Sequence, residues 1–166
     1  MRTAYADGRI YGVDVNEDFV ISLRKQQIKI HDFVGQLLQL IQPEGNTWDM
    51  TLFSDLILTG GGREDKFLRM WDFNFNRKCV AEMEGHDDGI VSISTHGDYL
   101  ASSDYSGGLQ IRKISRALEG HRSGFLKLRN SSPEPDDWCQ GVRLEHDFLA
   151  CWSKPTPNCI DVSYLS

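Results

Sequence analysis

The chain has 166 residues, of which 40% are hydrophobic and 25% are charged, and its formal net charge is -6. This composition is that of one globular domain with a hydrophobic core, and the acidic balance argues against a surface that binds nucleic acid or anionic lipid. The sequence contains no apolar run long enough to span a membrane, and its first residues lack the apolar stretch of a secretory signal.

Four blocks of twelve residues align without gaps along the chain. They are YGVDVNEDFVIS, WDMTLFSDLILT, VSISTHGDYLAS and QGVRLEHDFLAC, beginning at residues 11, 48, 91 and 140. The eighth position of every block is Asp, namely Asp18, Asp55, Asp98 and Asp147, and successive Asp residues are 37, 43 and 49 positions apart. The third position is always apolar, and the fifth is apolar in all blocks except the third, which has Thr95. The sequence therefore contains four copies of one structural unit.

Each block predicts a β-hairpin. Alternating apolar residues before the Asp are typical of a strand with one buried face, and the Asp suits a tight turn because its side chain can bond its own backbone. The apolar run after the Asp predicts a strand buried on both faces. A third strand is expected in each unit, at QIKIHDF (27–33), FLRMWDF (67–73), LQIRKIS (109–115) and CIDVSYL (159–165). A weaker fourth strand is expected at LLQLIQ, KCVAEME or ALEG.

The stretch HDFVGQLLQLIQ, residues 31–42, supports two interpretations. Its apolar residues have a helix-like spacing, so the stretch alone reads as an amphipathic helix. Within the repeat it is the end of one strand, a turn at Gly35 and an outer strand. We adopt the second interpretation because it explains all four units at once. Small sheets of this kind cannot bury both faces alone, and their radial stacking forms a propeller.

Two dipeptides resemble the marks of the WD40 repeat: Gly85-His86, which opens the third unit, and Trp71-Asp72, which closes the third strand of the second. His86 also lies twelve residues before Asp98, as in that family. The resemblance implies an all-β fold, a WD40-type β-propeller with four recognisable blades. It covers residues 1–166 as a single domain, with repeat units at about 9–43, 44–84, 85–119 and 120–166, and residues 1–8 as a candidate ring-closing outer strand.

Four blades are the fewest that a propeller has, and three arrangements are consistent with four units. In the first, the chain closes a four-bladed ring. In the second, it is part of a ring completed by a second copy or another protein, and in the third it is a piece of a longer chain. We favour an incomplete ring, whose exposed apolar blade face would promote association.

The resemblance further implies a hydrogen-bonded lock of His, Ser or Thr, Asp and Trp within each blade. The second and third units supply the residues at these positions and in the WD dipeptide: Thr59, Asp65, Trp71, Asp72, His86 and Ser102. The second unit has no His, and in the third unit Ser106 and Arg112 stand where the family has Asp and Trp. The first and fourth units lack the lock.

The sequence contains none of the common enzyme motifs. The glycine-rich TGGGRED, residues 59–65, lacks the GK[ST] of a P-loop and is interpreted as a flexible turn between two strands. The five histidines show no metal-ligand spacing, and the four cysteines show no CxxC pair, which favours reduced thiols. We therefore predict no enzyme activity, no catalytic, metal or cofactor-binding residues and no cofactor, in an intracellular protein, cytoplasmic or nuclear.

The predicted function is a non-catalytic protein–protein interaction scaffold or subunit, such as a substrate-recognition, adaptor or complex-assembly module. Its partners would be proteins, including a second copy that completes the ring, and neither nucleic acid nor membrane. Trp138 ends a long acidic connection and either packs between blades or anchors a partner. Alternatives are a propeller enzyme with a channel active site, or a phosphopeptide-binding adaptor of a ubiquitin ligase. The last needs several arginines on one face, for which Arg63, Arg69 and Arg112 are the candidates.

Overall fold

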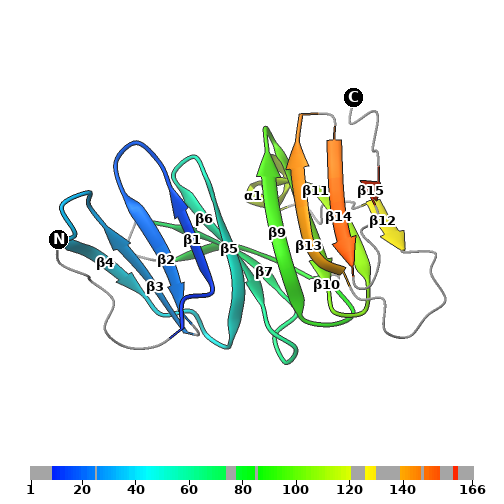
Figure 1. Ribbon diagram of the computed structural model, residues 1–166, viewed down its shortest axis with the longest axis horizontal. Helices are drawn as coiled ribbons and strands as arrows, with labels where there is room; N and C mark the ends of the chain where they lie inside the picture. The colour runs from blue at the N-terminus through cyan, green and yellow to red at the C-terminus, as the bar shows by residue number, and fades with distance from the viewer. Residues whose placement is uncertain are drawn as a thin grey trace.

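The computed structural model describes residues 9–24, 26–73, 78–84, 86–120, 126–129, 139–146, 148–153 and 159–160. The described strands form four antiparallel sheets, each built from strands that follow one another in the chain (Figure 1). We call the sheets blades 1 to 4 in chain order. The all-β fold expected from the sequence is confirmed.

Blades 1 and 2 each have four strands. Blade 1 consists of β1 (Gly12–Val15), β2 (Val20–Arg24), β3 (Gln27–His31) and β4 (Leu37–Ile41). Blade 2 consists of β5 (Thr47–Phe53), β6 (Leu56–Gly61), β7 (Leu68–Asp72) and β8 (Cys79–Met83). The stretch that read alone as a helix is thus strand β4, as the repeat predicted.

Blades 3 and 4 follow the same plan. Blade 3 consists of β9 (Ile90–His96), β10 (Tyr99–Asp104), β11 (Gly108–Lys113) and β12 (Leu126–Arg129). Blade 4 consists of β13 (Cys139–Glu145), β14 (Phe148–Ser153) and β15 (Cys159–Ile160). The remainder of the predicted strand CIDVSYL lies outside the described residues.

The first two strands of blades 2 and 3 are joined by two-residue hairpin turns. Asp55 and Asp98 occupy the second turn position, and the first is held by Ser54 and Gly97 at φ 52° and φ 53°. Positive φ at this position matches the twist of the flanking strands. In blades 2 and 3 the Asp that marks the repeat therefore also marks the turn, which is why these two hairpins are predictable from the sequence.

Three hydrophobic clusters hold successive blades together. Blade 1 contributes residues such as Ile21 and Ile28 to the first, which packs on Met50 and Trp71 of blade 2. The second cluster lies between blades 2 and 3, and the third between blades 3 and 4. No blade buries both faces alone, so burial of apolar area couples each blade to its neighbours.

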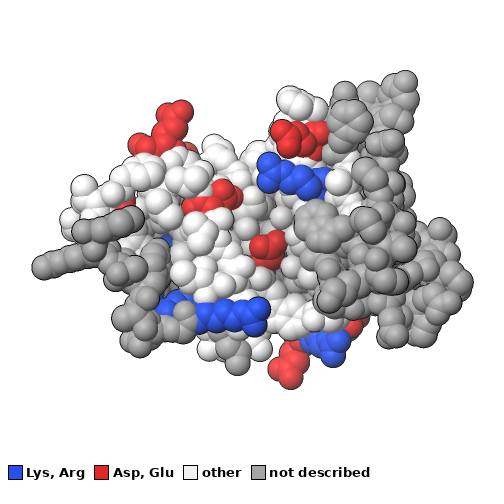
Figure 2. Space-filling model, in the orientation of Figure 1, with Lys and Arg blue, Asp and Glu red and all other residues white. Residues whose placement is uncertain are grey.

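The first strands of the blades, β1, β5, β9 and β13, lie next to one another, and we call them the inner strands (Figure 1). The face that carries them has few charged side chains among the described residues (Figure 2). One hydrogen bond at each junction joins a side chain to the backbone of the next inner strand. These bonds run from Leu52 N to Asp14 Oδ2 (2.8 Å), from Ile93 N to Asp49 Oδ2 (2.8 Å) and from Leu144 N to Ser94 Oγ (3.0 Å).

The blades form an open array rather than a closed ring. Blade 1 and blade 4 lie at opposite ends of the molecule, with blades 2 and 3 between them (Figure 1). The expected incomplete propeller is therefore what the described residues form. The candidate ring-closing strand, residues 1–8, lies outside them.

The prediction that ALEG is the fourth strand of the third unit is wrong. Ile114–Leu118 is the short helix α1, with Ile114 and Ala117 buried against blades 2 and 3. The Asp98 carboxylate accepts hydrogen bonds from Ser115 N (2.8 Å) and Ser115 Oγ (2.6 Å), which turns the chain away from the sheet edge. The fourth strand is β12, which pairs with β11 through Ile111 and Leu126. The unit boundary expected at residue 119 thus separates β12 from its own sheet and is corrected.

Candidate functional site

A buried hydrogen-bonded network occupies blade 3. The His86 ring bonds Ser102 Oγ through Nε2 (2.7 Å) and Asp104 Oδ2 through Nδ1 (2.9 Å). All three side chains are buried, and Ser102 and Asp104 are fully inaccessible to solvent. The network ties the chain segment before β9 to β10, the second strand of the blade. The role of a blade lock, expected for His86 and Ser102, stays a prediction.

Asp104 is the acid of this network, and it lies two residues before Ser106, which occupies the position where the family has its Asp. Its Oδ1 accepts hydrogen bonds from Ser106 N (3.0 Å), Ser106 Oγ (2.8 Å) and Gly108 N (2.7 Å). Burial alone would raise the pKa of the Asp104 carboxyl, but these bonds and that from His86 outweigh burial and hold the pKa below its ordinary value of 3.8. The signal in the sequence was an Asp before a turn that ends in Gly107, at φ 79°.

Ser102, His86 and Asp104 have the connectivity of a nucleophile–base–acid triad. A nucleophile must reach a substrate, and the Ser102 hydroxyl is completely covered. Gly108 adds to the cover, because a Cβ at this glycine would lie 2.5 Å from Asp104 Oδ2. The arrangement is therefore suited to holding the blade and not to acyl transfer.

Blade 2 carries a different set of contacts at the predicted lock positions. Trp71 Nε1 donates to Thr59 Oγ1 (2.9 Å), and both side chains are buried. Asp65 does not join them, because its carboxylate pairs with Arg69 Nη1 (2.6 Å). Asp72 ends β7, opposite Leu56.

Arg69 and Arg112 are not surface groups open to a partner, which corrects the expectation for these residues. Arg69 is bound by the carboxylates of Asp65 (2.6 Å) and Glu82 (2.7 Å). Arg112 is 4% exposed, and its guanidinium donates to Gln110 Oε1 (2.6 Å) and to the carbonyl of Glu84. Burial lowers the pKa of Arg112 to about 10. The three arginines proposed for phosphopeptide binding therefore do not share one exposed face.

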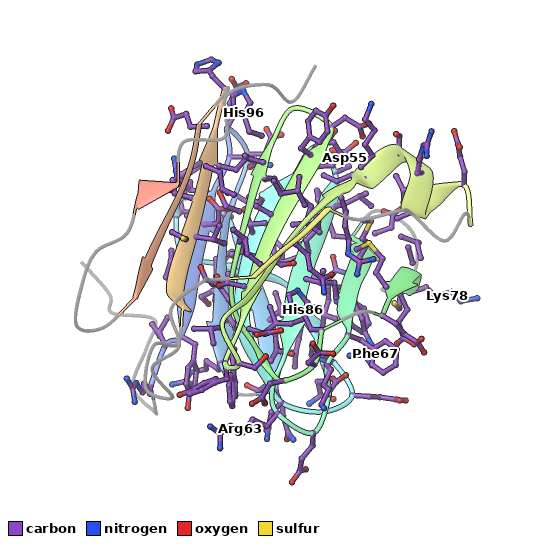
Figure 3. All side chains as sticks on the ribbon, turned by 90° about the vertical axis from the view of Figure 1, so that its right-hand side faces the viewer. Asp55, Arg63, Phe67, Lys78, His86 and His96 are labelled. Carbon is purple, nitrogen blue, oxygen red and sulfur yellow. The ribbon has the colours of Figure 1, made fainter. Side chains whose placement is uncertain are left out.

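Arg63 is the member of that set which is exposed, with 62% of its side chain accessible. It lies at the lower end of the blades, opposite the end that carries His96 and Asp55 (Figure 3). Its guanidinium lies over the ring of Tyr105, 4.5 Å from the centroid, and its Nε is 3.8 Å from Asp88 Oδ1. Tyr105 in turn packs edge-on against Trp48, with ring centroids 5.2 Å apart. We call Trp48, Arg63, Asp88 and Tyr105 the rim cluster.

The four residues of the rim cluster come from the start of one strand and from three connections between strands, in blades 2 and 3. Glycines let these segments pack closely together. A Cβ at Gly62 would lie 3.0 Å from the Trp48 indole, and one at Gly89 would lie 2.5 Å from Arg63 N. Tyr105 N also donates to the Gly89 carbonyl (3.0 Å). The glycine-rich segment expected to be a flexible turn is therefore closely packed, and its Gly60 and Gly61 belong to β6.

Among the described residues, no group of three or more His, Cys, Asp or Glu is arranged to hold a metal ion. No described helix is long and apolar enough to cross a membrane. Trp138, Gly85 and Asp147 lie outside the described residues, so their predicted roles are not assessed.

The strand pattern and the His86 contacts agree with a comparison of sequences. The family model "WD domain, G-beta repeat", WD40, matches residues 77–111, which contain β8, β9, β10 and most of β11. Residues 77–111 are therefore similar to a WD40 repeat. No curated protein matches this chain in sequence.

Two solved structures with a similar fold are designed proteins. The computationally designed Ika4 protein superposes with a TM-score of 0.73 at 15% identity, over 96% of this chain and 94% of that chain. The computationally designed Ika8 protein superposes with a TM-score of 0.66 at 15% identity, over 87% of this chain. The present chain spans 43% of the Ika8 chain. At this identity the likeness concerns the fold alone.

Proposed function

We propose that the chain is a non-catalytic, WD40-type interaction module that binds a protein partner through the rim cluster. The observation that carries this proposal is the guanidinium of Arg63, which is exposed and lies 4.5 Å from the Tyr105 ring centroid. Arg, Tyr and Trp are the residues most enriched at the energetic centres of protein interfaces. Repeat scaffolds of this family generally mediate protein–protein contacts, which supports the same proposal.

The geometry of the cluster favours a peptide with both an acidic and an apolar side chain. Arg63 holds Asp88 only at 3.8 Å, so an acidic group of a partner can compete for the guanidinium. The half-buried faces of Trp48 and Tyr105 offer apolar area next to it. Because the glycines keep the two aromatic rings in place, little conformational entropy is lost on binding.

Selection from a phage-displayed library of random peptides tests this proposal without knowledge of the partner. The wild-type chain is the bait, and the affinity of each enriched peptide is then measured by calorimetry. We expect Arg63→Ala and Tyr105→Ala each to weaken binding of an enriched peptide by about tenfold or more, as for residues at interface centres.

Arg116→Ala is the matched control, because Arg116 is an exposed arginine of α1 outside the rim cluster. It should bind the enriched peptides as the wild type does. Enriched peptides that bind Arg63→Ala and Tyr105→Ala with unchanged affinity would contradict the proposed site.

A further inference from the structure

The inner strand of blade 1 has an apolar row on which none of the described residues packs. The third position of the repeat faces the preceding blade and is buried in three blades, at Met50 (6% exposed), Ile93 (5%) and Val142 (3%). The equivalent Val13 is 61% exposed, and Val15, two residues further on the same face, is 55% exposed. The repeat therefore places on β1 the surface that elsewhere receives a preceding blade, and blade 1 has none within the described residues.

At the other end of the array, the inner strand of blade 4 carries an exposed charge, and no blade follows it within the described residues. In blades 1 and 3 the fourth position of the repeat contacts the following blade, since Asp14 bonds β5 and Ser94 bonds β13. In blade 2 the second-position residue Asp49 makes the equivalent bond, to β9. In blade 4 the fourth position is Arg143, whose side chain is 69% exposed and whose nearest carboxylate, Glu145, is 3.6 Å away. Exposed pairs of this kind contribute little to stability, so Arg143 remains available.

The junctions inside the chain indicate what Arg143 would meet. At the junction of blades 1 and 2 the two fourth-position side chains approach each other, because Thr51 Oγ1 donates to Asp14 Oδ2 at 3.3 Å. By the same register, Arg143 of blade 4 would face the fourth position of a blade that follows it. If that blade is blade 1 of a second copy, the residue there is Asp14, a carboxylate opposite a guanidinium. The two open ends are thus complementary in charge as well as in apolar area.

We infer that two copies of this chain associate head to tail, with β13 of each copy packed against β1 of the other. This contact continues the junction seen three times between blades 1 and 4. A head-to-tail contact forms a closed ring when the rotation permits, and two copies of four blades make eight, whereas three copies would exceed the four to eight blades typical of propellers. The inference involves the inner strands and is independent of the rim cluster.

Light scattering after size-exclusion chromatography measures the mass of the wild-type chain and of two variants. We expect the wild type to have twice the chain mass of 18.9 kDa. The blade 1 variant, Val13→Glu with Val15→Glu, puts acidic groups on the apolar row, and the blade 4 variant, Arg143→Glu, sets like charges against Asp14. Each variant alone should be monomeric, because both junctions of the ring then contain an altered surface.

Mixing the two variants restores one unaltered junction, between blade 1 of the Arg143→Glu chain and blade 4 of the Val13→Glu, Val15→Glu chain. We expect the mixture to contain a one-to-one dimer that neither variant forms alone. The matched controls are Val80→Glu on β8 and Arg116→Glu on α1, which change exposed residues away from both ends. They should leave the wild-type mass unchanged.

Several results would overturn the inference. A folded wild-type monomer or a non-specific aggregate would mean that the open ends do not recognise each other. A dimer that survives Arg143→Glu but not the blade 1 substitutions would indicate a contact between two copies of blade 1. A mixture of variants that stays monomeric would exclude the head-to-tail arrangement. Binding of selected peptides at the rim cluster would be unaffected by any of these outcomes.

Discussion

Asp104 is the residue on which the buried network of blade 3 depends, since it holds His86, Ser106 and Gly108 at once. Asp104→Ala would leave the His86 ring buried with an unmade hydrogen bond and would open the turn after β10. Loss of one partner from a buried polar pair costs about 3–5 kcal/mol, so we expect a decrease of that order in the free energy of unfolding. Urea unfolding measures it. Asp18→Ala removes an exposed turn carboxylate and should change the same free energy by less than about 0.5 kcal/mol. Equal effects of the two substitutions would show that the network is dispensable.

Gly60 in β6 illustrates a second constraint at the scale of single atoms. A Cβ at this position would lie 2.6 Å from Ile90 Cγ2 and 3.1 Å from Ile90 Cβ, across the junction of blades 2 and 3. We expect Gly60→Ala to destabilise the chain by about 1–3 kcal/mol, as overpacking of a core does. Gly12→Ala is the control, since its Cβ would lie no closer than 3.5 Å to another side chain. Thermal or urea unfolding of the two variants should differ clearly, and a stable Gly60→Ala protein would mean that the two blades separate at little cost.

Two carboxylates on different strands should give the stability opposite dependences on pH. Burial raises the pKa of Asp49, which bridges β5 and β9, whereas hydrogen bonds hold the pKa of Asp104 below its ordinary value of 3.8 against the opposing effect of burial. The contribution of Asp104 is present above pH 3.8 and is lost as the pH falls through its folded-state pKa. The contribution of Asp49 is present below pH 3.8 and is lost as the pH rises through its folded-state pKa.

Urea unfolding at a series of pH values distinguishes the contributions of Asp49 and Asp104 to the stability. The free energy of unfolding of the wild type should fall relative to that of Asp49→Asn as the pH rises above 3.8. The free energy of unfolding of the wild type should fall relative to that of Asp104→Asn as the pH falls below 3.8. If the two differences change in the same direction, the environment assigned to one of these carboxylates is wrong.

The elements themselves divide into those that a local pattern predicts and those that it does not. Strand alternation and a turn Asp are properties of neighbouring residues, so the hairpins around Asp55 and Asp98 and the outer strand β4 were predictable. The strand β12 was not, because its pairing with β11 spans the helix α1 and a long connection. Arg112 was assigned to the surface because arginine is seldom buried, and only the blade structure shows its partners Gln110 and Glu84.

The open array as a whole should unfold from its ends. Blades 2 and 3 have neighbours on both sides, whereas blade 1 and blade 4 are covered on one side within the described residues. Amide hydrogen exchange reports the free energy of such local opening, and protection falls where few apolar contacts must be broken. For a dilute, monomeric chain we therefore expect fast exchange in β1 and β13 and slow exchange in β6, β7 and β10.

If two copies close a ring, raising the protein concentration should slow exchange in β1 and β13 and leave β6 and β7 unchanged. Arg143→Glu should abolish that concentration dependence, while Arg116→Glu should retain it. Uniform exchange over all four blades at every concentration would instead mean that the array opens as one cooperative unit.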